Sequence, residues 1–164
     1  MKRAVVLLTI CLIAVLGHAQ SLSLSLAGVE LSNDTLYLIG NTQDVLLEAH
    51  VTVNNLTDKE IEVKAKKTEL LTLAETENSF CWGVCFPPFV FEAIESIKIG
   101  ANGSDTDSFI GDYTHSGIEG TSILRYTFFS TSNSSDSVSL VVFYQVGAAG
   151  VRDWTLDANL FKAY

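Results

Sequence analysis

Residues 121–146, TSILRYTFFSTSNSSDSVSLVVFYQV, decide the fold class of this chain. Two runs in this stretch, residues 121–130 and 137–146, are rich in aromatic and β-branched side chains, which favour strands. The polar residues 131–136 between them favour a turn. The stretch therefore predicts a β-hairpin.

Upstream, residues 21–26 read SLSLSL, a strict alternation of polar and apolar residues. A period of two places Leu22, Leu24 and Leu26 on one face of a strand. We expect an edge-like first strand here.

Two more hairpins are predicted between these ends. Residues 45–53 and 60–66 flank the turn-forming segment 54–58, and residues 96–99 and 106–113 flank the glycine- and aspartate-containing segment 100–105. In residues 60–66, apolar residues alternate with Glu and Lys, so one face of that strand should be wet.

The spacing of Val90, Ile94 and Ile97 after the Pro87-Pro88 pair leaves a helix over residues 89–97 as an alternative. Strands at this density, with no convincing amphipathic helix elsewhere, predict an all-β chain folded as a β-sandwich.

Size and charge narrow the class of protein. The chain has 164 residues, enough for one domain, and its 10 Lys and Arg against 19 Asp and Glu give a net charge of -9. Such an acidic surface repels phosphate backbones, so we expect no nucleic-acid partner.

The first 19 residues have the pattern of an export signal. Lys2 and Arg3 precede the apolar run 4–16, and Gly17 and Ala19 stand at the small-residue positions of a cleavage site. We expect cleavage after Ala19 and no stable membrane span afterwards, because the run is shorter than the roughly 20 residues that cross a bilayer. A retained anchor is the alternative.

Export makes a bridge the favoured state of the two cysteines left after cleavage, Cys81 and Cys85. Redox-active dithiols of the thioredoxin type use two intervening residues at a helix N-terminus, and that context is missing here. A structural disulfide is therefore predicted, with free or metal-binding thiols and redox catalysis as alternatives.

No catalytic residue is predicted. Asp105 and Asp107 offer oxygen ligands suited to calcium, but their surroundings do not match a known calcium loop, and we expect a solvated turn and no cofactor. His50 and His115 are the imidazole bases of the mature chain, and no serine stands in a Gly-x-Ser-x-Gly elbow. Glycoside hydrolysis uses a pair of carboxylates, but any chain this acidic would offer such pairs, so their presence does not indicate this activity.

Asn-x-Ser/Thr triplets, the acceptors for N-glycans in a eukaryotic secretory pathway, all fall in predicted turns. They begin at Asn33, Asn55, Asn102 and Asn133.

Several motifs together resemble an immunoglobulin-like module of secreted Bacteroidota proteins, commonly exported by the type IX secretion system. They are FCWGVCFPP (80–88), IGDY (110–113), GIEGTS (117–122), RYTFF (125–129) and DSV (136–138). The match covers roughly residues 45–164. Its last part resembles the linker that leads, in that family, into a C-terminal sorting domain opening with Tyr-Pro-Asn-Pro, and this chain ends at Tyr164, where that domain would begin.

The resemblance implies an immunoglobulin-like β-sandwich of about seven to nine antiparallel strands over residues 20–146, followed by a linker or tail over residues 147–164. It also implies a place in the periplasm or on the outer surface of a Gram-negative bacterium, where Asn-x-Ser/Thr triplets should be unmodified. The expected function is binding, adhesion or spacing without catalysis, toward an extracellular protein or glycan. An exported thiol oxidoreductase or metal-assisted hydrolase is the alternative.

Overall fold

The computed structural model describes residues 20–31 and 35–147, so the predicted export signal, Asn33 and the tail beyond Gly147 lie outside the described residues. Thirteen strands occur within these ranges. They are β1 (Leu22–Leu26), β2 (Val29–Glu30), β3 (Thr35–Asn41), β4 (Leu47–His50), β5 (Thr52–Asn55), β6 (Ile61–Leu71), β7 (Glu77–Trp82), β8 (Val84–Phe86), β9 (Ile97–Ile99), β10 (Ser104–Asp105), β11 (Phe109–Thr114), β12 (Gly120–Ser130) and β13 (Asn133–Gly147).

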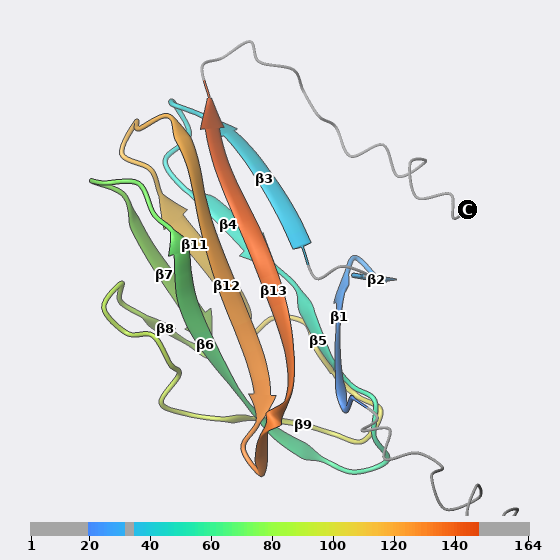
Figure 1. Cartoon of the computed structure of the whole chain (residues 1–164). Coiled ribbons are helices and arrows are strands. Elements are labelled where there is room, and N and C mark those ends of the chain that lie inside the picture. Colours follow the sequence, from blue (N-terminus) through green and yellow to red (C-terminus); the bar gives the residue numbers. More distant parts are fainter. Residues whose placement is uncertain (1–19, 32–34, 148–164) are drawn as a thin grey trace, which may run out of the picture.

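The strands form two layers (Figure 1). One layer is a five-stranded sheet with the order β3-β13-β12-β6-β9. The other consists of two four-stranded sheets, β10-β5-β1-β2 and β4-β11-β7-β8. Only Val51 separates β4 from β5, so these two sheets are consecutive along one run of chain. The arrangement is an immunoglobulin-like β-sandwich, as the sequence predicted.

Aromatic side chains from both layers fill the core. The ring centroids of Trp82 on β7 and Phe128 on β12 are 5.3 Å apart, and Phe109 on β11 meets Phe128 edge-on at 5.0 Å. The indole N–H of Trp82 donates to the carbonyl oxygen of Val63 at 3.0 Å, so its polar atom is satisfied inside the core.

The hairpin over residues 121–146 is confirmed. Strands β12 and β13 pair antiparallel from Gly120↔Val146 to Ser130↔Asn133. The turn is shorter than predicted, because Asn133–Asp136 belong to β13 and only Thr131 and Ser132 lie between the strands. The wet face of residues 60–66 is also confirmed, with Val63 and Ala65 buried and Glu62 and Lys66 exposed.

The other two predicted hairpins are wrong. Strand β5 pairs with β1 and β10, whereas β6 pairs with β12 and β9 in the other layer. Likewise β9 pairs with β6, and β11 pairs with β4 and β7. Alternation reveals which face of a strand is buried but not which strand lies beside it, and both turns lead from one layer to the other.

Two further expectations need correction in detail. Strand β1 is not at an edge, since it lies between β5 and the short β2. Strand β3 pairs with β13 in parallel, although all pairs were expected to be antiparallel.

Residues 89–97 are not helical: Phe91 O accepts from Lys67 N at 2.7 Å and Ala93 N donates to Ala65 O at 2.8 Å, which ties this segment to β6 in an extended form.

Candidate functional site

The outer face of the five-stranded sheet carries a row of apolar side chains across four strands. Phe143 on β13 pairs with Tyr37 on β3 and with Ile123 on β12, and Ile123 pairs with Leu71 on β6. Directly paired residues project on the same side of a sheet, so these four side chains are neighbours. The inward positions between them hold core residues such as Leu124 and Tyr144.

This row is open to solvent at both ends. Tyr37 is 57% exposed and Leu71 is 50% exposed, while Ile123 and Phe143 between them are half-buried by their neighbours. The Tyr37 and Phe143 rings stack with centroids 4.7 Å apart. Ile39 lies two residues after Tyr37 on the same face of β3 and is also exposed. We call these five residues the outer apolar band.

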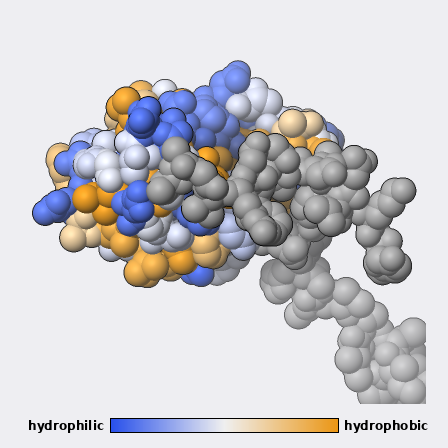
Figure 2. Space-filling view, turned by 90° about the horizontal axis from the view of Figure 1, so that it is seen from above, coloured by the Kyte–Doolittle hydropathy of each residue, from blue (hydrophilic) through white to orange (hydrophobic). Residues whose placement is uncertain are grey.

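Figure 2 views the molecule from above, so its lower margin is the side that faces the viewer in Figure 1, where the five-stranded sheet lies. Apolar residues gather along this margin. Contiguous exposed apolar surface of this kind is a usual mark of an interaction site.

Basic side chains follow the band on the same face. Arg125 is exposed two residues after Ile123 on β12 and pairs with Val141 and Thr68. Lys66 and Lys64 lie farther along β6, where Lys66 Nζ is 5.5 Å from the centroid of the Phe129 ring. The sequence analysis did not group the band and these basic residues into a site, because they come together only once four strands are in register.

A second group of exposed apolar side chains lies at and after the cysteines. Val84 stands between Cys81 and Cys85, and Phe89, Phe91 and Ile94 lie in the segment that follows them. The buried Lys67 secures this segment, since its Nζ donates to Asn78 O at 2.7 Å and to Pro88 O at 2.9 Å. Burial lowers the pKa of Lys67, and the charge of Glu69 opposes that shift.

The predicted disulfide between Cys81 and Cys85 is present. The two residues face each other across the tight hairpin of β7 and β8, where Gly83 takes a φ of 72° that favours glycine. Cys81 is buried and Cys85 is exposed. The bridge therefore joins two strands. Redox thiols are activated in a different setting, at a helix N-terminus.

The acidic turn does not gather ligands. Asp105 accepts hydrogen bonds from the backbone N–H and the hydroxyl of Ser108, at 2.9 and 2.7 Å, while Asp107 is exposed. Within residues 20–31 and 35–147, no three His, Cys, Asp or Glu side chains are grouped as a metal site would need.

The two histidines occupy unlike places. His50 is exposed at the end of β4, and its Nε2 is 3.9 Å from Glu48 Oε2. His115 is buried after β11, where its Nδ1 accepts the backbone N–H of Gly117 at 3.1 Å.

On the outer side of β11, burial raises the pKa of Asp112. The charge of Glu48 adds to this shift, while the hydrogen bond from Ser79 and the charge of His50 oppose it.

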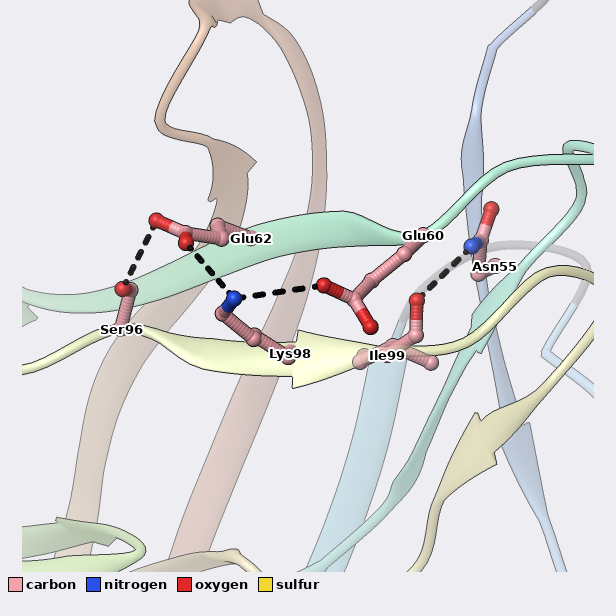
Figure 3. Close-up of polar contacts among 6 residues, drawn as sticks. All are labelled: Asn55, Glu60, Glu62, Ser96, Lys98 and Ile99. Carbon is pink, nitrogen blue, oxygen red and sulfur yellow. Dashed lines mark hydrogen bonds and ion pairs between the residues drawn. The ribbon is translucent and has the colours of Figure 1, made fainter.

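The described asparagines of the predicted triplets also differ. Asn55 is buried, and its amide donates to the carbonyl oxygen of Ile99 (Figure 3). The same amide also donates to the carbonyl oxygens of Lys59 and Gly100. Asn102 and Asn133 are exposed. Among the three described triplet asparagines, Asn102 and Asn133 are the ones whose side chains a glycan could reach in the folded domain.

An open depression of about 480 Å³ lies over the outer face of the sheet formed by β10, β5, β1 and β2. The residues that line it are mostly small and polar. Among them, Asn54 joins Ser25 to Ser104, because its amide donates to Ser25 Oγ and its Oδ1 accepts from Ser104 Oγ.

The sequence matches no family model and no curated protein. Among solved structures, the chain is similar to the N-terminal domain of PorA, with a TM-score of 0.60 and 18% identity over 79% of this chain and 99% of that chain. It also aligns with PapD-like domain 7 of human CEP192, with a TM-score of 0.44 and 11% identity over 79% of this chain and 87% of that chain. The likeness to the PorA domain shows a shared β-sandwich fold.

Proposed function

We propose that this protein is an exported, non-catalytic immunoglobulin-like module that binds a partner through the outer apolar band. The observation that carries the proposal is the exposed row from Tyr37 to Leu71, which crosses four paired strands without any part of the described chain covering it. A sheet face is a rigid platform, so binding there costs little ordering of the protein.

Three features of the chain support a place outside the cytoplasm. They are the export pattern of residues 1–19, the Cys81–Cys85 bridge, and the resemblance to secreted Bacteroidota modules. Within the described residues, no helix is long and apolar enough to cross a membrane. The exported protein should begin at Gln20, which a measurement of its intact mass would test.

The segment after β13 is proposed to be a linker rather than part of the sandwich. The residues that follow the last residue of β13, Ala148, Ala149 and Gly150, are small and cannot fill a core position. Removing residues 150–164 should leave the unfolding midpoint unchanged, and a drop of about 5 °C or more would assign the tail to the core.

The binding proposal is tested by selecting peptides from a phage-displayed random library on the wild-type protein. The double variant Tyr37→Thr and Leu71→Thr removes the exposed ends of the band while keeping residues suited to strands. Val29→Thr and Val84→Thr, at two other exposed apolar positions, form the matched control.

Selected peptides should bind the band variant at least about tenfold more weakly than the wild type, and the control normally. Binders that are insensitive to the band variant, or equally weakened by the control, would contradict the proposal.

A further inference from the structure

We infer that the band takes an acidic protein segment, one in which aliphatic or aromatic side chains alternate with Asp or Glu. This inference rests on the proposed function and names the chemistry of its partner. Its evidence is the distribution of charge on the outer face of the five-stranded sheet.

The chain carries nearly two acidic residues for each basic one, yet the basic residues near the band stand on its own face. Arg125 is two residues from Ile123 on β12, a separation of roughly 7 Å along a strand. Lys66 and Lys64 continue this basic stretch on the neighbouring strand β6. A ligand lying on the band therefore meets cationic side chains on an otherwise acidic molecule.

These cations are not neutralised by the described part of the chain. The ion pairs among the described residues join Lys98 to Glu60 and Glu62, and His50 to Glu48. Arg125 pairs across the sheet with the uncharged Val141 and Thr68.

Glu92 faces Lys66 across an isolated bridge, without an ion-pair contact between the two side chains. The charges of the basic stretch are thus left for a partner, and the attraction should speed association and set the preferred sign of the ligand.

A second copy of this chain is a poor occupant of the face. In a twofold contact centred on the band, Arg125 would approach its own symmetry mate, and two chains of net charge -9 would repel each other. A nucleic acid is disfavoured too, because the net charge of -9 repels a continuous phosphate backbone while the band itself is apolar. An acidic segment with apolar anchors satisfies both halves of the face.

The test compares two charge-reversed proteins that have the same net charge. Arg125→Glu with Lys66→Glu reverses the stretch beside the band, whereas Lys59→Glu with Lys98→Glu makes the same change elsewhere. Random dodecapeptides are selected on the wild type and kept if the band variant weakens them. Their composition is read, and their affinities are measured for both charge variants at low and high salt.

We expect band-dependent peptides to be enriched in Asp and Glu over the unselected library, to bind the Arg125/Lys66 variant at least about tenfold more weakly, and to weaken with salt. Reversal of Lys59 and Lys98 should change affinity much less. A fluorescent single-stranded oligonucleotide serves as the second probe and should not bind.

Band-dependent peptides that are neutral or basic, or equally affected by both charge variants, would overturn the inference and leave the proposed function standing. Oligonucleotide binding that depends on Arg125 and Lys66 would overturn it in favour of a nucleic-acid partner. A library without any band-dependent binder would contradict both proposals. Circular dichroism of each variant confirms that a lost affinity is not a lost fold.

Discussion

The phenol of Tyr144 on β13 donates a hydrogen bond to the backbone carbonyl oxygen of Gly111 on β11, 2.9 Å away in the opposite layer. The same phenol oxygen lies 3.1 Å from that of Tyr126, whose hydroxyl must be the donor because the Tyr144 proton is already engaged. Burial raises the pKa of both phenols, so they stay neutral and the contact between the layers persists through the physiological range.

Gly111→Ala should therefore destabilise the fold strongly. A Cβ at this position would lie 2.8 Å from the Tyr126 phenol and 2.9 Å from the Tyr144 oxygen, so the two buried phenols or the strand would have to shift. We expect a loss of about 2–4 kcal/mol in the free energy of unfolding, measured in urea. Gly100→Ala is the control, since its Cβ would meet nothing within 4 Å. Equal losses from both changes would show that the phenols do not set the limit.

This contact illustrates what the sequence could predict. The strand-forming composition of residues 121–130 and 137–146 correctly predicted the central hairpin, because strand propensity and turn chemistry are local properties. Nothing local marks Gly111 as the residue over which two tyrosines meet. The need for glycine arises from the register of β11 against the other layer, which depends on the whole fold.

The candidate site was missed for the same reason. Tyr37, Ile123 and Leu71 are far apart in the sequence, and Leu71 fell outside the strand predicted over residues 60–66. In contrast, the Cys81–Cys85 bridge followed from residue type and export alone.

Lys67→Met should flatten the rise of stability at alkaline pH. Because burial lowers the pKa of Lys67 in the folded state, the unfolded chain binds more protons between that pKa and the ordinary value of 10.5. Stability of the wild type must therefore rise as pH increases through this window, and methionine removes that contribution. Urea unfolding at a series of pH values from 7 upward measures this rise. The control is Lys66→Met, at the exposed neighbouring position, which should keep the wild-type dependence of stability on pH.

Asp112→Asn should stabilise the protein at neutral pH. Desolvation raises the folded-state pKa of Asp112 above the ordinary value of 3.8, so between these values the folded state holds a proton that the unfolded state has lost. Stability then falls as pH rises through this window, and an uncharged amide avoids the loss. Thermal unfolding should show a higher midpoint for the variant at pH 7 and no gain below pH 3.8. A lower midpoint at pH 7 would mean that the Ser79 contact outweighs desolvation.

Replacing Cys81 and Cys85 together by alanine should cost about 2 kcal/mol, the loop-closure entropy of so short a ring. The residues are only four apart in sequence, so the bridge holds a local hairpin rather than the whole sandwich. Reduction of the wild type should lower stability by the same amount. Peptide mapping without reductant should find the bridge, and two freely alkylated thiols in protein recovered from its export compartment would refute it.

Asn55→Ala should be the costliest of the asparagine substitutions. The Asn55 amide donates to Ile99 O at 3.0 Å (Figure 3). It also donates to Gly100 O at 2.9 Å, and its Oδ1 accepts from the backbone N–H of Thr57 at 2.9 Å. These bonds join the end of β5 to the turn after β9, so they connect the two layers where the predicted hairpins proved wrong.

Alanine at position 55 leaves the buried Ile99 carbonyl, the part-buried Gly100 carbonyl and the part-buried Thr57 N–H without this partner, at an expected cost of about 2–3 kcal/mol. The control is Asn133→Ser, an exposed residue whose Oδ1 accepts only the nearby Ser135 N–H at 3.2 Å, and it should change stability by less than about 0.5 kcal/mol. Urea unfolding compares the two variants. Asn55→Asp sharpens the test: it keeps the acceptor for Thr57 but replaces the donor by a second acceptor facing carbonyl oxygens, so it should be at least as damaging as alanine. An Asp variant as stable as the wild type would show that the donated bonds to β9 do not hold the layers together.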